Sequence, residues 1–352
     1  ILFGTFFQQL YNAADAMIVG RFVGKEALSA VGGSTSMLTQ LIVGFFVGLS
    51  SGASVIVSQY YGAKRPEMVG YAVHTALMFS ILSGIVIMAA GIILAPAMLA
   101  AMGTPEDVQG LSVIYLRIYF LGIIANLVYN MGAAILRAVG DSKRPLYFLA
   151  ASCLTNIALD ILLVVVCRLG VVGAALATIL SQLLSAVLVA VCLIRTRDMH
   201  RLVLKELRLD GHMLRRIIRI GLPAGMQSVM YGLSNVIIQA GINSLGTNSV
   251  AAWAAYSKLD SVFWMMINAL GISATTFVGQ NFGAGRLDRV RKGAGACMVI
   301  GVVLTASVGV VLYNGGHLLV ELFTTDQQVQ AISKVPRRPR ANHSLPEAAQ
   351  PV

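Results

Sequence analysis

The sequence alternates long apolar runs with short polar connectors. Nine runs are long enough to cross a bilayer, because a membrane helix needs about 20 mostly apolar residues. They cover approximately residues 1–20, 33–60, 69–100, 110–137, 145–167, 171–194, 221–244, 250–279 and 293–314, and a tenth begins near His317. The first run lacks the basic region and cleavage site of a signal peptide. The pattern predicts an all-α polytopic membrane protein of about nine to ten helices.

Composition and charge agree with the bilayer as the main partner. Hydrophobic residues make up 57% of the chain and charged residues only 12%, whereas charged residues are about 25% of a soluble domain. The connectors after the second, fourth, sixth and eighth runs hold 17 Lys and Arg, and those after the first, third, fifth and seventh hold 3. The positive-inside rule therefore predicts a cytoplasmic N-terminus. The four cysteines lie in apolar runs and are interpreted as buried thiols.

The longest connector, at 195–219, carries eight of these basic residues. Apolar and basic residues alternate in it at roughly helical spacing, which predicts an amphipathic helix at the anionic inner leaflet. Nucleic-acid binding would also explain the net charge of +11. No aromatic residues are interleaved with the basic ones, so no nucleic-acid partner is expected. We interpret the connector as a boundary between two halves.

The two halves resemble each other. SQYYGAKR at 58–65 matches GQNFGAGR at 279–286, 221 positions later, and GKEALSAV at 24–31 matches GTNSVAAW at 246–253. A parallel internal repeat of this kind is a common way to build a transporter with a site between two lobes. Chance similarity between apolar helices is the alternative. Gly62 and Gly283 are predicted to end helices in the matched turns, and Gly44, Gly48 and Gly52 to let another helix approach closely.

The repeat and the composition predict four regions. A first six-helix lobe covers 1–194, with its first helix cut short, and the connector covers 195–220. An incomplete second lobe covers 221–332, and a Pro-rich disordered tail covers 333–352. The tail is expected to be out-of-frame or foreign sequence.

Polar residues recur at one-turn spacing inside the helices of the first lobe. The pairs and triplets are Gln8, Tyr11 and Asp15; Asn126 and Asn130; Asn156 and Asp160; and Thr178 and Gln182. An ionised Asp at the bilayer centre costs several kcal/mol, so such residues usually face a cavity and are functional. Their oxygens suit Na⁺, and desolvation would instead suit proton coupling. Fixed hydrogen bonds between helices are the alternative.

The second half repeats the polar stripe without its acid. With an offset of 220 positions, Asp15 falls on Asn235, within the stripe Gln227, Tyr231, Asn235 and Gln239. The repeat therefore does not require a carboxylate at this position. Residues expected to line a cavity for substrate are Gln8, Tyr11, Asn130, Gln227, Tyr231 and Asn235.

Six pieces in order resemble the multidrug and toxic compound extrusion (MATE) family, closest to its bacterial and archaeal branch. They are QQLYNAADAMIVGRFVGKEALSAVG, the SQYYGAKR turn, ILRAVGDSKRPL, LTNIALDILLV, GVVGAALATILSQ and FVGQNFGAGR. The resemblance covers about residues 1–325. It implies two lobes of six helices, of which this chain lacks the start of helix 1 and helices 10 to 12.

The resemblance also implies a function and a site. Such proteins export organic cations and other drugs in exchange for Na⁺ or H⁺. This chain is expected to be a monomer in the cytoplasmic membrane of a prokaryote. The coupling residues would be Asp15, Asn156, Asp160, Thr178 and the backbone carbonyl of Ala174. Na⁺ would bind at Asp15, Asn156, Asp160 and Thr178, and no cofactor beyond the coupling ion is expected.

Enzyme classes find no support in the sequence, which contains no GxSxG, HExxH or Walker A motif. Without a P-loop, an ion gradient is the expected energy source. A lipid-linked precursor flippase of the same superfamily is one alternative. It would need several cationic residues facing the cavity, and Arg117 is the main candidate. A non-functional fragment is the other alternative.

Overall fold

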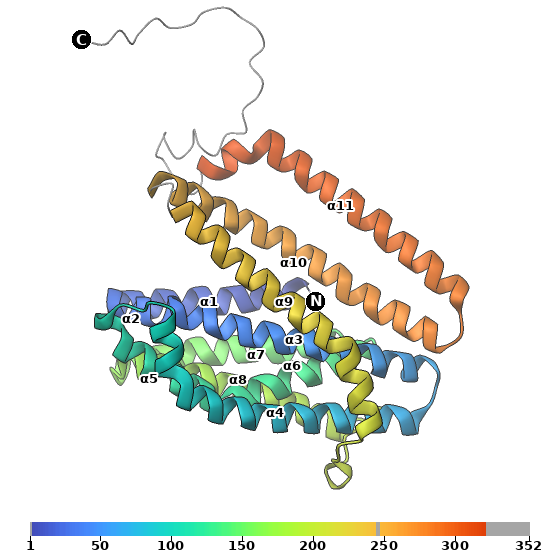
Figure 1. Cartoon of the computed structure of the whole chain (residues 1–352). Helices are drawn as coiled ribbons and strands as arrows, with labels where there is room; N and C mark the ends of the chain where they lie inside the picture. The colour runs from blue at the N-terminus through green and yellow to red at the C-terminus, as the bar shows by residue number, and fades with distance from the viewer. Residues whose placement is uncertain (1, 244–246, 322–352) are drawn as a thin grey trace, which may run out of the picture. The chain divides into compact units, whose positions relative to one another are not determined.

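The computed structural model describes residues 2–243 and 247–321, and all of the regular structure in these ranges is helical (Figure 1). The helices are α1 Leu2–Phe22, α2 Lys25–Gly32, α3 Ser34–Gly62, α4 Pro66–Ala101, α5 Glu106–Leu121, α6 Ile123–Ala138, α7 Lys143–Asp160, η1 Ile161–Val166, α8 Gly170–Arg195, η2 Leu204–Glu206, α9 Gly211–Asn243, α10 Thr247–Gly283 and α11 Leu287–Glu321. The predicted all-α class is confirmed. The predicted tail at 333–352 lies outside the described residues.

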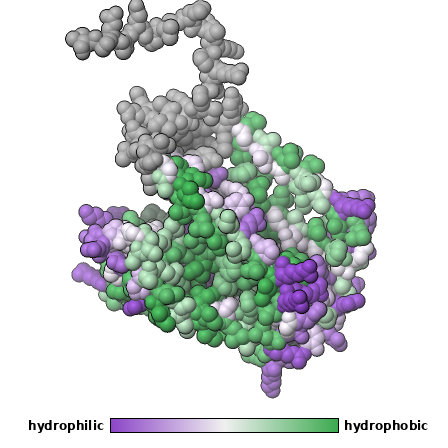
Figure 2. Space-filling view, viewed as in Figure 1, coloured by the Kyte–Doolittle hydropathy of each residue, from purple (hydrophilic) through white to green (hydrophobic). Residues whose placement is uncertain are grey.

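Five helical segments in the described ranges are long and apolar enough to cross a membrane, or six if the bent pair α5 and α6 is one span. This number is smaller than the nine runs predicted. The runs at 1–20, 221–244 and 250–279 form α1, α9 and α10, but these helices are not among the five. Hydrophobic side chains cover much of the visible surface of α3 and α4, and hydrophilic ones gather near the helix ends (Figure 2).

The chain divides into two compact units. The first contains Ile1–Asn235 and Asn268–Cys297, and the second contains Val236–Ile267 and the residues from Met298 onward. Helices α9, α10 and α11 each contribute to both units. The predicted domain borders follow the sequence repeat and remain a prediction. All contacts described below lie within the first unit.

Helix α9 packs closely on α3 through the predicted glycine positions. A Cβ added to Gly48 would lie 2.6 Å from the Cα of Gly225, and one added to Gly52 would overlap the carbonyl oxygen of Ile217. At Gly44 the nearest atom, on Ser228, is 3.8 Å away. Lipid gives little hydrophobic force between helices, so close backbone packing is a main source of association. The prediction of a close helix partner is confirmed, and the partner is α9.

The two matched turns have the same geometry. Helices α3 and α10 end at Gly62 and Gly283, as predicted. Three backbone hydrogen bonds of the first turn each have an equivalent in the second. In the first turn, the N–H groups of Ala63, Lys64 and Arg65 donate to the carbonyl oxygens of Gln59, Tyr61 and Tyr60, at 2.9, 3.0 and 3.1 Å. In the second turn, the N–H groups of Ala284, Gly285 and Arg286 donate to the carbonyl oxygens of Gln280, Phe282 and Asn281, at 3.0, 3.0 and 2.9 Å. We call the end of the first unit that carries these turns, with Lys64, Arg65 and Arg286, the basic end.

The run at 110–137, predicted as one helix, is two helices bent by 49°. The break lies at Gly122, whose backbone N–H bonds the carbonyl oxygen of Tyr119 at 3.0 Å in a tight turn. A Cβ added to Gly122 would overlap Ile179 of α8. The glycine therefore allows the close approach of α8 at the bend.

The amphipathic helix predicted for 195–219 is wrong. Helix α8 ends at Arg195, only the three-residue η2 is helical before Gly211, and the remaining residues form the first turns of α9. The connector bonds instead to α4. The Val203 N–H donates to His74 Nε2 at 3.0 Å and the Asp210 N–H to Thr75 Oγ1 at 3.2 Å. Backbone groups that bond to side chains in this way compete with helix formation.

Two other boundaries differ from the prediction. Helix α11 continues to Glu321, so the predicted break between a helix ending at 314 and one starting near His317 is wrong. The Asn-Gly-Gly at 314–316 lowers helix propensity without ending the helix. The short helix α2 lies in a stretch that was predicted as a connector.

Candidate functional site

The acids of the first half lie in a bundle of α1, α7 and α8, which pack on one another. Asp15 of α1 is 7% exposed, and Asn156 and Asp160 of α7 are fully buried. The two carboxyl groups are close enough to interact electrostatically. The structure therefore brings together two acids that are 145 positions apart in the sequence.

Several polar atoms at this place have no hydrogen-bond partner. They are Oδ1 of Asp15, both carboxyl oxygens of Asp160 and both amide atoms of Asn156. A buried polar group left unpaired costs about 1–3 kcal/mol, and more if it is charged. Such groups in a native protein require an explanation, such as an ion or a catalytic role. Their clustering indicates a site for a cation or a proton.

Thr178 and Ala174 of α8 are also buried. The Thr178 hydroxyl donates to the Ala174 carbonyl oxygen at 3.0 Å. This bond uses the hydroxyl proton and leaves the lone pairs of the Thr178 oxygen available to a cation. Within the described residues no group of three or more His, Cys, Asp or Glu could hold a metal ion. Asp15, Asn156, Asp160 and Thr178 offer hard oxygens, which suit an alkali cation.

Two features beside the acids were not predicted. The Ser152 hydroxyl donates to the Ser181 carbonyl oxygen at 2.7 Å and joins α7 to α8. Ser152, Asn156 and Asp160 follow one another at intervals of four residues, which places them on one face of the helix. This spacing is a sequence signal that could have identified Ser152. The second feature is the π-helix η1, which begins directly after Asp160. π-Helical turns occur often at functional sites, but an apolar run such as ILLVVV gives no sequence signal for one.

The residues predicted to line a cavity for substrate differ in exposure and in hydrogen bonding. The side chains of Gln8 and Tyr11 lie outside the described residues. Asn130 donates to the carbonyl oxygen and the side-chain oxygen of Asn126, at 2.9 and 3.0 Å, so it makes a local bond. On α9, Gln227 and Asn235 are exposed, and Tyr231 is 52% exposed. The role of these residues in lining a cavity remains a prediction.

Comparison with known proteins places this arrangement in a family. The family model MatE matches residues 1–162 and 223–336. The chain belongs to the MatE family. The probable multidrug resistance protein YoeA of Bacillus subtilis (strain 168) is 30% identical over 340 residues, which cover 95% of this chain and 73% of the relative. The resemblance found in the sequence motifs is confirmed.

Two further matches agree with this assignment. The multidrug export protein MepA of Staphylococcus aureus is 24% identical over 335 residues, covering 94% of this MatE chain and 72% of the relative. A crystal structure of MATE in the bent conformation has the same fold, with a TM-score of 0.86 at 24% identity over 94% of this chain and 75% of that one.

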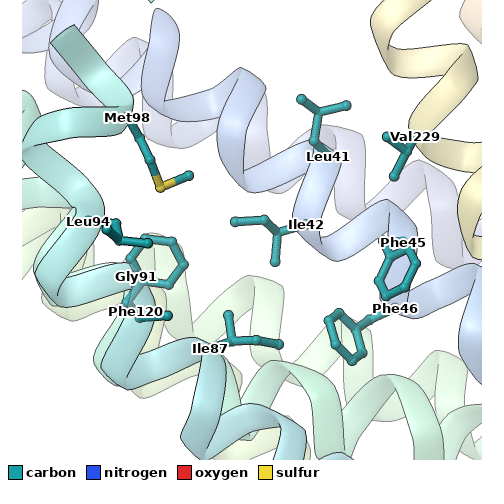
Figure 3. A pocket seen from close by; sticks show the side chains of 11 residues that line it. Leu41, Ile42, Phe45, Phe46, Ile87, Gly91, Leu94, Met98, Phe120 and Val229 are labelled. Carbon is teal, nitrogen blue, oxygen red and sulfur yellow. The ribbon is translucent and has the colours of Figure 1, made fainter. Parts of the chain in front are cut away.

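The MatE chain also has an apolar cavity of about 380 Å³ that does not include the acids (Figure 3). The cavity is lined by Leu41, Ile42, Phe45 and Phe46 of α3, Ile87, Ala90, Gly91, Leu94 and Met98 of α4, Phe120 of α5 and Val229 of α9. A Cβ on Gly91 would lie 2.5 Å from the Phe120 ring, so this glycine lets the ring pack against α4. An apolar space and a polar site are thus separate parts of the first unit.

Proposed function

We propose that this MatE protein is a secondary active multidrug efflux antiporter. It exports organic cations or other drug-like molecules in exchange for H⁺ or Na⁺. The observation that carries the proposal is the pair of buried carboxyl groups, Asp15 and Asp160, beside Asn156, with unpaired polar atoms on all three. The names of YoeA and MepA support drug export. The protein is a multi-pass monomer of a prokaryotic plasma membrane with a cytoplasmic N-terminus, and it is not an enzyme.

The charge at the site gives a physical basis for coupling. Two ionised carboxylates in a buried site repel each other, so the empty site favours neutralisation of one of them. Na⁺ would be held by oxygens of Asp15, Asn156 and Asp160, with the Thr178 hydroxyl and the Ala174 carbonyl completing the set. A proton would instead neutralise one carboxyl group. Either ion changes the charge between α1 and α7 and so favours a different packing of α1, which alters the affinity for substrate.

The substrate class is inferred from the apolar cavity, which does not include the acids. The cavity of α3 and α4 offers only apolar contacts, which suits the flat apolar part of many drugs. A flippase of lipid-linked precursors would need cationic side chains there. Arg117 is exposed, and its Nε donates to the Ile92 carbonyl oxygen at 3.3 Å. Drug export is therefore favoured over the flippase.

Ethidium accumulation in a pump-deficient strain tests the proposal. Cells that express the native chain should accumulate less dye than cells with an empty vector. Asp15→Asn and Asp160→Asn should raise accumulation to the vector level, because both remove a carboxylate from the site. The matched control is Asp107→Asn, an exposed acid at the start of α5, which should behave as the native chain.

Two results would contradict the proposal. Equal protection by the native chain and both buried-acid variants would exclude the coupling role. No protection by the native chain would favour the flippase or an inactive fragment. Repeating the assay with Na⁺ replaced by K⁺ then identifies the ion, since a Na⁺-coupled protein loses efflux in K⁺ buffer and a H⁺-coupled one does not.

A further inference from the structure

The two matched turns at the basic end contact each other at equivalent positions. Gly62 of the first turn lies against Gln280 of the second, and Gly283 of the second lies against Gln59 of the first. Each glycine and its counterpart are 221 positions apart, and so are the two glutamines. The contact is therefore reciprocal, like the self-complementary interface of a two-fold dimer.

Both glycines are required by the space between the turns. A Cβ added to Gly62 would overlap the carbonyl oxygen of Gln280, and one added to Gly283 would overlap that of Gln59. A third equivalent pair continues the contact, because a Cβ added to Gly279 would overlap the hydroxyl of Ser58. The partners are backbone atoms at both turn glycines, so no side-chain rotation can make room for an added methyl group.

Hydrogen bonds from α10 to the end of α6 hold the same region together. The Gln280 side chain donates from Nε2 to the Ala138 carbonyl oxygen at 2.8 Å. One turn earlier, the Thr276 hydroxyl donates to the Arg137 carbonyl oxygen at 3.2 Å. Both bonds use carbonyls at the C-terminal end of a helix, which have no partner within that helix.

The contact lacks the features of a permanent interface. No salt bridge among the described residues joins the two turns. Beyond the glycines the turns carry charges of the same sign, on Lys64 and Arg65 in one and on Arg286 in the other. Like charges oppose close approach, whereas the glycine packing and the two hydrogen bonds favour it. A contact held by backbone packing and two hydrogen bonds, with basic residues on both turns, can open and close.

We propose that the matched turns form a glycine gate that closes the basic end between the two repeats. Gly62 and Gly283 set how tightly the gate closes. The gate opens when the protein exposes its interior to the basic side and closes when it exposes the opposite side. The role rests on the proposed transport function, but the closed contact itself can be measured without transport.

Distances between spin labels test the gate. Glu67→Cys and Asp288→Cys place labels on exposed residues just beyond the two turns, again 221 positions apart, in a protein whose native cysteines are replaced. The native glycines should give a mainly short distance. Gly62→Ala and Gly283→Ala should raise the ratio of long to short distances by about tenfold, the effect expected from overpacking.

Gly70→Ala and Gly295→Ala are the matched controls, because an added Cβ at either position meets no atom within 4 Å. Both should leave the distances unchanged. The proposal fails if the turn variants keep the native distances, or if the controls change them as much. These outcomes do not depend on ion coupling, so failure of the gate is distinguishable from failure of the antiport proposal.

A second experiment keeps the native glycines and so avoids any folding defect. Ala63→Cys and Ala284→Cys place one thiol on each turn, directly after the glycine. Joining them with a short, reducible cross-linker should stop dye efflux, and reduction should restore it. Native efflux from fully cross-linked protein would overturn the gate.

Discussion

The polar stripes of α1 and α9 occupy matched positions in the two halves, but their surroundings differ. Asp15 of α1 is buried beside Asp160 of α7. Asn235, its counterpart on α9, is exposed. Of these two matched positions, the acid occurs at the one that the fold buries. The comparison shows that the second half forms the matched helix without a carboxylate at this position, so the repeated scaffold does not require the acid.

The two matched turns, in contrast, are alike in structure. They share their hydrogen bonds and their glycines, and they contact each other reciprocally. The polar side chains of the matched helices α1 and α9 differ between the two halves. The backbone geometry of the two matched turns is the same. This distinction predicts where substitutions from one half into the other are tolerated.

The largest expected effect comes from moving the acid between the halves. The exchange variant Asp15→Asn with Asn235→Asp keeps the net charge and the number of acids. We expect its dye efflux to stay about tenfold or more below that of the native chain, because an exposed acid on α9 has neither the burial nor the neighbours that make an intramembrane acid functional. Efflux in the pump-deficient strain is the measurement. Recovery to half of the native rate would show that the two positions are interchangeable.

A smaller effect is expected on stability. Asn156→Leu removes two buried amide atoms without partners and keeps a similar volume. We expect it to stabilise the ion-free protein by about 1–3 kcal/mol while abolishing coupled efflux. Asn235→Leu, at an exposed site, should change stability by less than about 0.5 kcal/mol. Thermal unfolding in Na⁺-free buffer measures both. A lower melting temperature for Asn156→Leu would mean that its amide is hydrogen-bonded.

The smallest effect concerns one residue of the turns. Lys64 has a left-handed φ of 54°, and its counterpart Gly285 has a φ of 72°. A left-handed conformation costs a non-glycine residue about 1–2 kcal/mol. Lys64→Gly should relieve part of this cost, and Gly285→Lys should add a similar one. Unfolding midpoints of the two variants should therefore move in opposite directions. Shifts of the same sign would show that the two turns are not energetically equivalent.

Local signals in the sequence predicted much of the fold. Apolar runs located α3, α4, α7 and α8, and the glycines of the matched turns located two helix ends. The same signals located two buried acids, because a charge within an apolar run is conspicuous. Their roles in coupling remain predictions.

Features that depend on tertiary contact were not predictable. The bend lies at Gly122, where Ile179 of α8 approaches closely, and nothing in the run at 110–137 distinguishes this glycine from others inside helices. The connector is irregular because its backbone bonds His74 and Thr75, more than 120 positions earlier. Periodicity alone suggested a helix there. The glycines of α3 indicate in the sequence that another helix approaches closely. They do not indicate that this helix is α9.

The π-helix after Asp160 also fixes the rotational phase of α7. An α-helix turns by about 100° per residue, so one additional residue within a turn rotates everything on one side of it relative to the other. Removing one residue from 161–166 would turn Asp160 by about that angle relative to the end of η1, which packs on α8. The length of a purely apolar segment thus sets the register between the acid and the residues that follow it, and we expect a single-residue deletion there to disable the site without altering any polar side chain.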